Sequence, residues 1–206
     1  MKIEKYENLN SVQFATLKKA EDVASKLAAS AFLSVIGKNV MISTPTVRLQ
    51  AFQDAIDSIG EPDSMFAGIS VGLSGDIEGV VMLLIEQEVA QGIIGTVLGI
   101  PDGDSLGVSA LTEIGSVMTS SCVSAITMYS DLLVFPEVPC FGMDMLVALM
   151  SIPVIEFEQK MSDKLLLMEK NLKVDNVNIH CNMVLALTQP CLELLLSRLD
   201  SEAWAL

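Results

Sequence analysis

The chain has 206 residues, and its charge excludes several classes of partner. It carries 12 Lys and Arg against 26 Asp and Glu, so its net charge of −14 would repel nucleic acid and anionic membrane surfaces. The mean hydropathy is high at +0.52, but the longest uncharged runs contain too many polar residues to predict a membrane span. We therefore expect partners that are proteins or small molecules.

The N-terminus and the cysteines predict a cytoplasmic protein. The N-terminal segment includes acidic side chains and no apolar run, unlike a secretory signal. The cysteines are widely spaced among apolar residues, and they are Cys122, Cys140, Cys181 and Cys191. Without a Cys-x-x-Cys pair, this pattern predicts reduced, buried thiols rather than a disulfide or a zinc site.

The first half of the chain predicts a long helix, a strand, a short helix, a hairpin and a second helix. The long helix spans about residues 12–35, where apolar residues recur at helical spacing, at Phe14, Leu17, Val23, Leu27, Ala31 and Val35. After Gly37, the β-branched run 39–47 predicts a strand that Pro45 confines to a sheet edge or a strand end. The remaining elements are a helix at 51–59, a hairpin of strands 65–73 and 79–85, and a helix at 88–98.

The same order of elements repeats from about residue 105. A long helix to residue 129 is followed by a strand-like segment that Pro136 and Pro139 interrupt. The segments 143–150 and 154–159 then predict a helix and a strand. The last elements are a hairpin around an Asp175-Asn176 turn, with strands 165–174 and 177–188, and a closing helix at 191–199.

The two halves also align residue by residue. The segment that begins at Leu17 matches the segment that begins at Leu111 without a gap, at an offset of 94 residues (111 − 17). Near the end of each half, the segment from Met82 resembles the segment from Val184 at an offset of 102 residues (184 − 82). The difference in offset is easily absorbed by longer loops.

This repetition predicts an α+β fold in a single domain of residues 1–206, with repeats at about 11–100 and 105–200. We expect two pseudo-symmetric halves that share one antiparallel sheet of about six strands. The two long helices should pack on one side of the sheet and present their polar faces to solvent.

A polar stripe on the second long helix is the main candidate for a functional site. Ser109, Glu113 and Ser116 stand at i, i+4 and i+7, so they share one face of the helix. Pro139 follows Ser116 after 22 intervening residues (139 − 116 − 1). A polar stripe alone is typical of a solvated face, but the proline at a fixed distance indicates a motif.

This spacing resembles the signature of the CheC family of chemotaxis phosphatases, whose relatives include CheX and FliY. The signature has Asp or Ser, Glu, Asn and Pro at these positions, and it occurs once or twice in a duplicated chain. Ser109, Glu113 and Pro139 match it here, whereas Ser116 stands where the family has Asn. As an order of elements, the resemblance covers nearly the whole chain.

The resemblance implies a partner and a reaction. In this family the helix docks beside the phosphorylated Asp of a CheY-type receiver, the Glu pairs with a receiver Lys, and the Asn orients a water for in-line attack. Glu113 would therefore dock the receiver, and Ser116 would orient the water with a shorter, freely rotating side chain. No cofactor of the chain's own is expected, because the receiver supplies the Mg²⁺.

The first long helix carries a copy of the motif that departs further from the signature. Pro45 follows Asp22 after 22 intervening residues (45 − 22 − 1), but Ala15, Lys19 and Asp22 replace the expected Asp or Ser, Glu and Asn. Lys19 would meet the receiver Lys with like charge, and Asp22 would bring negative charge toward the phosphoryl group. This copy is therefore not expected to act as a phosphatase site.

The leading hypothesis is a CheC-like regulator that binds a phosphorylated receiver and hydrolyses its aspartyl phosphate slowly. The missing Asn leaves a second hypothesis open, namely a non-catalytic module that binds a receiver or the deamidase CheD. A scaffold unrelated to receivers is the third hypothesis.

Other chemistry has little support in the sequence. His180 is the sole histidine and has no partner at a recognisable catalytic or metal-binding spacing. Asp102 and Asp104 resemble a calcium loop only superficially, because no Glu follows at the required position. We therefore predict no metal site in this chain.

Overall fold

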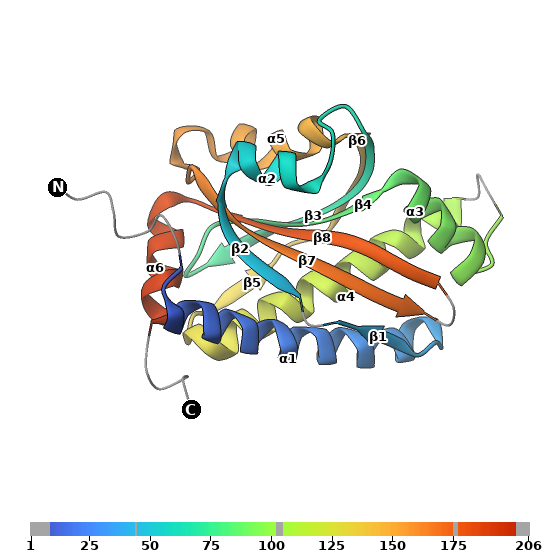
Figure 1. Ribbon diagram of the computed structural model, residues 1–206, viewed down its shortest axis with the longest axis horizontal. Helices are drawn as coiled ribbons and strands as arrows, with labels where there is room; N and C mark the ends of the chain where they lie inside the picture. Colours follow the sequence, from blue (N-terminus) through green and yellow to red (C-terminus); the bar gives the residue numbers. More distant parts are fainter. Residues whose placement is uncertain (1–8, 44, 102–104, 175–176, 201–206) are drawn as a thin grey trace.

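The computed structural model describes residues 9–43, 45–101, 105–174 and 177–200. One antiparallel sheet lies between two layers of helices, so the predicted α+β class is confirmed (Figure 1). The sheet has eight strands rather than about six, in the order β1-β7-β8-β4-β3-β5, with β2 also paired to β7 and β6 to β3. The strands are β1 (Val40–Ile42), β2 (Thr46–Ala51), β3 (Met65–Gly75), β4 (Gly79–Glu86), β5 (Val134–Pro136), β6 (Cys140–Met145), β7 (Lys164–Val174) and β8 (Val177–Leu187).

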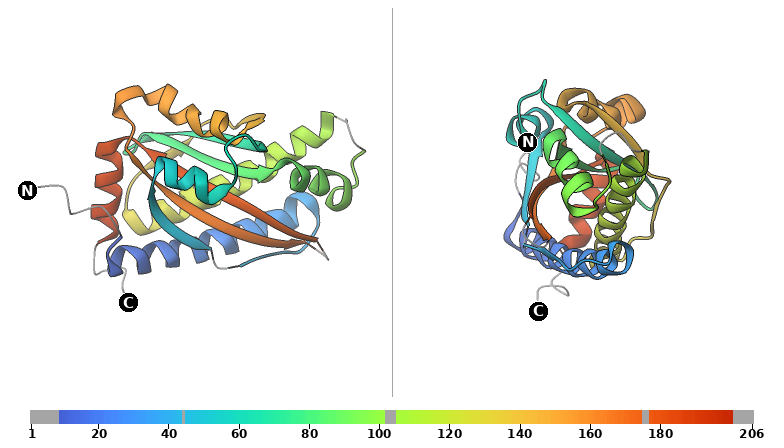
Figure 2. Two further views of the ribbon diagram at one scale, coloured as in Figure 1. Left: turned by 45° about the horizontal axis from the view of Figure 1, so that its top comes forward. Right: turned by 90° about the vertical axis from the view of Figure 1, so that its right-hand side faces the viewer.

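Two long helices cover one face of the sheet, and two shorter helices cover the other (Figure 1 and Figure 2). The long helices are α1 (Ser11–Ile36) and α4 (Ser105–Ser130), which also pack against each other. The shorter helices are α2 (Phe52–Ile59) and α5 (Leu146–Phe157), and α5 ends in the 3-10 turn η2 (Glu158–Lys160). At opposite ends of the molecule lie α6 (Gln189–Leu199) and α3 (Gln87–Gly92), which continues into the π-helical turn η1 (Ile93–Val97).

The order of elements is the same from either edge of the sheet. At one edge the short strands β1 and β2 pair with the long strand β7, and at the other edge β5 and β6 pair with β3. The hairpins β3–β4 and β7–β8 meet at the centre, where β4 pairs with β8. Met82 of β4 lies directly opposite Val184 of β8. These are the two residues that the sequence alignment makes equivalent, so the register is the one a two-fold axis between β4 and β8 requires. The internal repeat itself stays a prediction.

The two central strands are buried on both faces of the sheet. Val81 and Leu83 of β4 belong to the core beneath α1 and α4, while Val80 and Met82 belong to the core beneath α2 and α5. A fully buried side chain of this size stabilises the fold by about 1.5–3 kcal/mol. This double coverage explains why β4 reads as a continuous apolar run rather than as an alternating one.

The buried face of α1 differs from the one that its apolar residues predict. Leu17 and Phe32 reach the core, but the predicted apolar residues Phe14 and Leu27 remain 45% and 42% exposed. The reason is that α1 has two contact surfaces, one on the sheet and one on α4. On the second surface small residues such as Ala24 allow close approach.

One predicted strand is a helix. Residues 154–159 favour a strand by composition, but they lie in α5 and η2. The edge strand is instead β6, which includes the first three residues of the predicted helix 143–150 and pairs with β3. Burial along one side of a helix outweighs the strand propensity of the exposed β-branched residues. The buried residues of α5, at helical spacing, are Leu146, Leu149, Met150 and Pro153.

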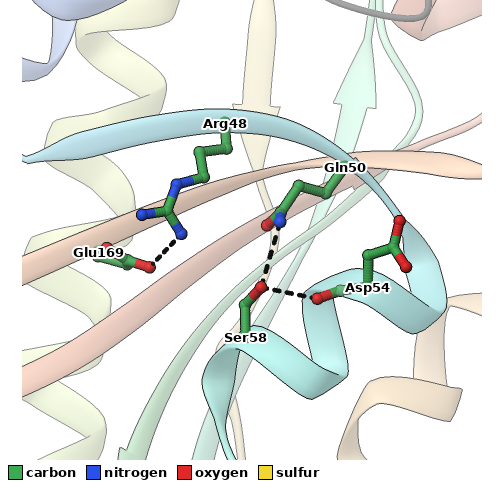
Figure 3. Close-up of polar contacts among 5 residues, drawn as sticks. All are labelled: Arg48, Gln50, Asp54, Ser58 and Glu169. Carbon is green, nitrogen blue, oxygen red and sulfur yellow. Dashed lines mark hydrogen bonds and ion pairs between the residues drawn. The ribbon is translucent and has the colours of Figure 1, made fainter.

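Polar contacts join the edge strand β2 and α2 to the rest of the sheet (Figure 3). Arg48 Nη1 donates to Glu169 Oε1 of β7 at 2.8 Å. Gln50 Nε2 donates to Ser58 Oγ at 3.1 Å, and Ser58 Oγ donates to the carbonyl oxygen of Asp54 at 2.7 Å. An exposed ion pair of this kind contributes at most about 1 kcal/mol, so we interpret these contacts as tethers.

Candidate functional site

The predicted polar stripe lies on the outer surface of α4. Ser109 and Glu113 are exposed and Ser116 is half-buried, whereas Leu111 and Gly115 on the opposite side are buried. Glu113 is the only charged residue in this helix of 26 residues. Next to Glu113, the outer surface of α4 therefore carries the small, uncharged side chains of Ser109 and Ser116, while larger apolar side chains such as Leu106 and Met128 are exposed toward the ends of the helix.

Close packing between Gly115 of α4 and Ile69 of β3 fixes the distance between this helix and the sheet. A Cβ atom added to Gly115 would lie 2.6 Å from Cγ2 of Ile69, a fully buried residue of β3. Only glycine therefore lets α4 approach β3 so closely at the position directly before Ser116. In the next turn, Thr119 Oγ1 donates to the carbonyl oxygens of Gly115 at 2.8 Å and Ser116 at 3.1 Å.

Ser116 opens onto a groove between the two long helices. The groove has a volume of about 350 Å³. Its lining residues are Ser116, Val117, Ser120, Ser121 and Ser124 of α4 and Leu27 and Ala31 of α1. The exposed Leu27 is thus one wall of this groove. The sequence stripe did not reveal the groove, because its walls come from helices that are far apart in the chain.

The corresponding residues of the first motif copy lie on α1 and are not among the residues that line this groove. Ala15 is exposed, and Lys19 and Asp22 are half-buried. Neither Lys19 nor Asp22 lines the groove. The second copy thus lines this concave surface through Ser116.

The two motif prolines each stand directly before an edge strand. Pro45 is buried and precedes β2, and Pro139 is half-buried and precedes β6. A proline has no N–H group to donate to a ladder, so it fits the start of an edge strand. This position gives both prolines a structural role, and their part in binding stays a prediction.

A buried charge cluster beneath α1 was not predicted from the sequence. Lys170 Nζ of β7 lies 2.5 Å from Glu21 Oε2, and both side chains are only 3% exposed. Cys122 Sγ of α4 donates to Glu21 Oε1 at 3.3 Å, and Cys181 of β8 is the cross-strand neighbour of Lys170. The cluster therefore ties α1, α4 and the sheet together from inside the protein.

The protonation states in this cluster follow from burial and from the carboxylate. Burial raises the pKa of Cys122 well above its ordinary value of 9.0, and the charge of Glu21 raises it further. Burial likewise raises the pKa of Cys181 to about 12. Burial acts to lower the pKa of Lys170, but the Glu21 carboxylate outweighs it, so this pKa is raised from 10.5. At neutral pH the thiols are protonated and Lys170 is charged, which suits a structural cluster rather than a nucleophile.

The four cysteines are free, as expected, but they are not all buried. Cys122 and Cys181 are fully enclosed. Cys191 is half-buried, and Cys140 is exposed because it begins the edge strand β6. The prediction of buried thiols is therefore wrong for Cys140.

Other candidate sites carry little chemistry. His180 is exposed on β8, where its Nδ1 lies 3.0 Å from Asn171 Oδ1 of β7. Asp102 and Asp104 lie outside the described residues. Within the described ranges, no three His, Cys, Asp or Glu side chains gather as metal ligands would.

The length and composition of α4 would allow it to cross a membrane, and it is the one such helix in the described part of the chain. Half of the apolar window is buried inside the protein. The buried apolar residues of α4 pack against α1 and the sheet, as in a core helix. The cytoplasmic location stays a prediction.

The chain was compared with protein families, curated proteins and solved structures. No family model matches the chain. The chain is 24% identical over 161 residues to the CheY-P phosphatase CheC of Bacillus subtilis (strain 168). The aligned region covers 75% of this chain and 77% of CheC. The structure of Thermotoga maritima FliY superposes with a TM-score of 0.73 at 13% identity, covering 94% of this chain and 99% of FliY. The FliM middle domain from H. pylori superposes with a TM-score of 0.63 at 12% identity, covering 92% and 99% of the two chains.

The fold is therefore the one shared by FliY and the FliM middle domain. Together with the sequence similarity to CheC, this fold confirms the predicted resemblance to the CheC-like chemotaxis phosphatase family.

Proposed function

We propose that this chain is a CheC-like regulator of two-component signalling that binds the phosphorylated receiver of a CheY-type response regulator through α4. Glu113 pairs with a receiver lysine, and Ser116 orients a water toward the aspartyl phosphate, which is hydrolysed slowly. The similarity to a CheY-P phosphatase supports the choice of partner.

The outer surface of α4 is the observation that carries this proposal. It offers one exposed carboxylate, Glu113, beside the small side chains of Ser109 and Ser116, and a groove begins at Ser116. Small uncharged side chains let another protein approach the helix closely, since little charge has to be desolvated. The single charge then fixes the register of the partner.

The proposed reaction requires only orientation from this chain. A water attacks phosphorus, the bond from phosphorus to the aspartyl oxygen breaks, and the products are inorganic phosphate and a free carboxylate. The proton lost by the water passes to the phosphate or to solvent. The Mg²⁺ that neutralises the phosphoryl group belongs to the receiver, and the chain itself supplies no cofactor.

The identity of residue 116 limits the rate. A serine hydroxyl can donate and accept, but it is shorter than an asparagine amide and rotates freely. Loss of one well-placed polar group typically costs about 100-fold or more in rate. We therefore propose a slow phosphatase with its activity on α4 alone.

The absence of Asn from both motif copies favours a second candidate function. With Ser116 on α4 and Asp22 on α1, the chain would act as a non-catalytic adaptor that holds a phosphorylated receiver or the deamidase CheD. In the receiver-binding form of this alternative, Glu113 keeps its docking role and Ser116 has none in chemistry.

Phosphate release from a phosphorylated CheY-type receiver with Mg²⁺ separates these functions. We expect weak acceleration by the natural chain, acceleration about 100-fold greater by Ser116→Asn, and loss of both with Glu113→Lys. Ser124→Asn is the matched control, because it places the same amide at an exposed position eight residues along the same groove.

Phosphate release, together with binding measurements on the phosphorylated receiver and on purified CheD, separates the candidate functions. No acceleration by the natural chain, with clear acceleration by Ser116→Asn, would leave the receiver-binding adaptor. Binding of purified CheD that Glu113→Lys does not alter, without receiver binding, would favour the CheD adaptor. If no variant bound the phosphorylated receiver or CheD, both proposed functions would be wrong.

A further inference from the structure

Positive charge is missing from the middle of the chain. Residues 49–159 contain 16 Asp and Glu and no Lys or Arg, whereas the rest of the chain contains all 12 Lys and Arg and 10 Asp and Glu (26 − 16). The net charge is therefore −16 in the middle segment and +2 (12 − 10) in the rest. In the fold, the middle segment supplies β4, β3, β5 and β6, which run from the centre of the sheet to one edge, and the helices α4 and α5 that pack on them. The charged residues on these elements are all acidic.

The edge strand β6 of this acidic half has one unpaired side. β6 pairs with β3, and no strand of the described ranges pairs with its other side. Free sheet edges are usually protected by lysine or proline, because their unpaired N–H and C=O groups can pair with another chain. β6 contains neither residue type. Pro139 directly before the strand and Leu146, where α5 begins, limit the free edge to Cys140–Met145.

The two faces of β6 carry different side chains. Met143 lies opposite Ala67 of β3, which belongs to the core beneath α1 and α4, so Met143 and Met145 point to the α4 side. Asp144 lies opposite Phe66, which belongs to the core beneath α2 and α5, so its carboxylate is on the α5 side. All three of these β6 side chains are exposed. A strand added beside β6 would therefore meet apolar side chains on one face and a carboxylate on the other.

We propose that the free edge of β6 binds an extended segment of a partner protein by strand addition, and that this segment alternates apolar and basic side chains. Its apolar side chains pack on Met143 and Met145, and its lysine or arginine side chains lie beside Asp144. The backbone N–H and C=O groups on the free side of β6 supply the hydrogen bonds. This inference does not depend on the proposed function of α4.

Charge complementarity selects a basic partner over a second copy of this chain. Two copies joined through β6 would bring together two acidic halves, with the exposed Glu137 and Asp144 of both copies at the junction. The first basic residue after the acidic segment is Lys160, which lies beyond the far end of α5, about 20 Å along the helix from β6. A basic segment is instead attracted by every carboxylate in this half of the molecule.

The test uses a fluorescently labelled peptide that alternates valine and lysine over eight residues. One control peptide has the same composition but groups its valines before its lysines, and a second control has proline at the two central positions. Binding to the natural chain is followed by fluorescence anisotropy at low salt and at about 0.5 M salt. We expect the alternating peptide to bind at low salt and less tightly at high salt. Both controls should bind at least about tenfold more weakly, because neither can add a strand with this alternation.

Two pairs of variants locate the site on the protein. Asp144→Lys should weaken binding of the alternating peptide about tenfold, because it replaces an attraction by a repulsion. Asp57→Lys makes the same change in net charge on α2, which packs against β2 and β7 at the opposite edge of the sheet, and should weaken binding less than about twofold. Met143→Ser should weaken binding about fivefold through lost apolar contact, and its matched control is Met41→Ser in β1 at that opposite edge. All four side chains are exposed, so circular dichroism should show every variant folded.

Several results would overturn the inference. If the alternating peptide did not bind at low salt, or bound no better than the grouped one, β6 would not select an alternating strand. Equal weakening by Asp144→Lys and Asp57→Lys would mean that net charge alone acts. A dimer of the natural chain in sedimentation velocity that Met143→Ser dissociates would make a second copy the occupant of β6. None of these results bears on the proposed phosphatase function, which is measured with a phosphorylated receiver and Glu113→Lys.

Discussion

Lys170→Met removes the cation that neutralises Glu21 beneath α1. The two charged atoms lie 2.5 Å apart with both side chains 3% exposed, so water cannot replace the lysine without opening the helix layer. Removing one partner of a buried ion pair typically destabilises a protein by about 3–5 kcal/mol, because the other charge stays buried. Cys122 still donates to Glu21, which favours the lower part of that range.

The double substitution Glu21→Met with Lys170→Met should restore most of this loss. Met has nearly the volume of either side chain, and replacing a whole buried pair by apolar residues is often neutral or stabilising. Since a domain is typically stable by only about 5–15 kcal/mol, the single variant should lose a large fraction of its stability. The double variant should unfold close to the natural chain.

Urea denaturation of the four proteins in the cycle measures these free energies. The expected result is a double variant more stable than either single variant. The reasoning would be refuted if Lys170→Met were as stable as the natural chain, or if the double variant lost the sum of the two single losses. Either result would mean that the charges are solvated in solution and that α1 is not held by them.

Three further predictions concern the same helix layer. The free energy of unfolding should fall above about pH 9, because the thiols of Cys122 and Cys181 ionise there in the unfolded chain but stay protonated in the folded one. Each thiol contributes a slope of about 1.4 kcal/mol per pH unit. Urea denaturation at a series of pH values should show a shallower fall for Cys181→Ala. Gly115→Ala should cost about 1–3 kcal/mol by overpacking against Ile69, and an unchanged thermal midpoint would show that α4 lies further from β3. Asn10→Ala should cost about 1 kcal/mol, because Asn10 Oδ1 accepts from the first-turn N–H groups at 2.9 and 2.8 Å, while Asn10→Asp should keep most of the stability.

Local patterns were sufficient to predict the central elements of the fold. The strands 65–73 and 79–85 and the long helix from 105 agree with β3, β4 and α4 to within a few residues. These segments are long, and their apolar residues follow one period throughout. The sequence did not predict that β4 pairs with β8, although the observed register agrees with the repeat alignment.

Elements at the sheet edges were harder to predict, because tertiary contacts decide them. The segment 154–159 has strand composition, yet it continues a helix whose other side is buried from Leu146 onward. The edge position beside β3 is already taken by β6. Composition cannot show which of two neighbouring segments occupies a single edge position.

The sequence predicted which site residues share one face of α4, but not which residues of α1 lie beside them. Helical spacing correctly placed Ser109 and Glu113 on the exposed side of α4. It could not place Leu27 and Ala31 of α1 beside Ser116, since that contact depends on how the two helices pack. The exposure of Leu27 was wrongly predicted for the same reason.

At one aligned position, α4 contacts the sheet through a glycine and α1 contacts it through a charged side chain. The offset of 94 residues that aligns the helices places Gly115 on Glu21 (115 − 21). On α4 the glycine lets the helix descend onto Ile69, whereas on α1 a carboxylate fills that position and requires Lys170 beneath it. A carboxylate at position 115 would meet the apolar core with no cation, and a glycine at position 21 would leave Lys170 buried and unpaired. The two halves therefore cannot exchange this residue, and the fold assigns the close-packed support to the helix that carries Glu113 and Ser116.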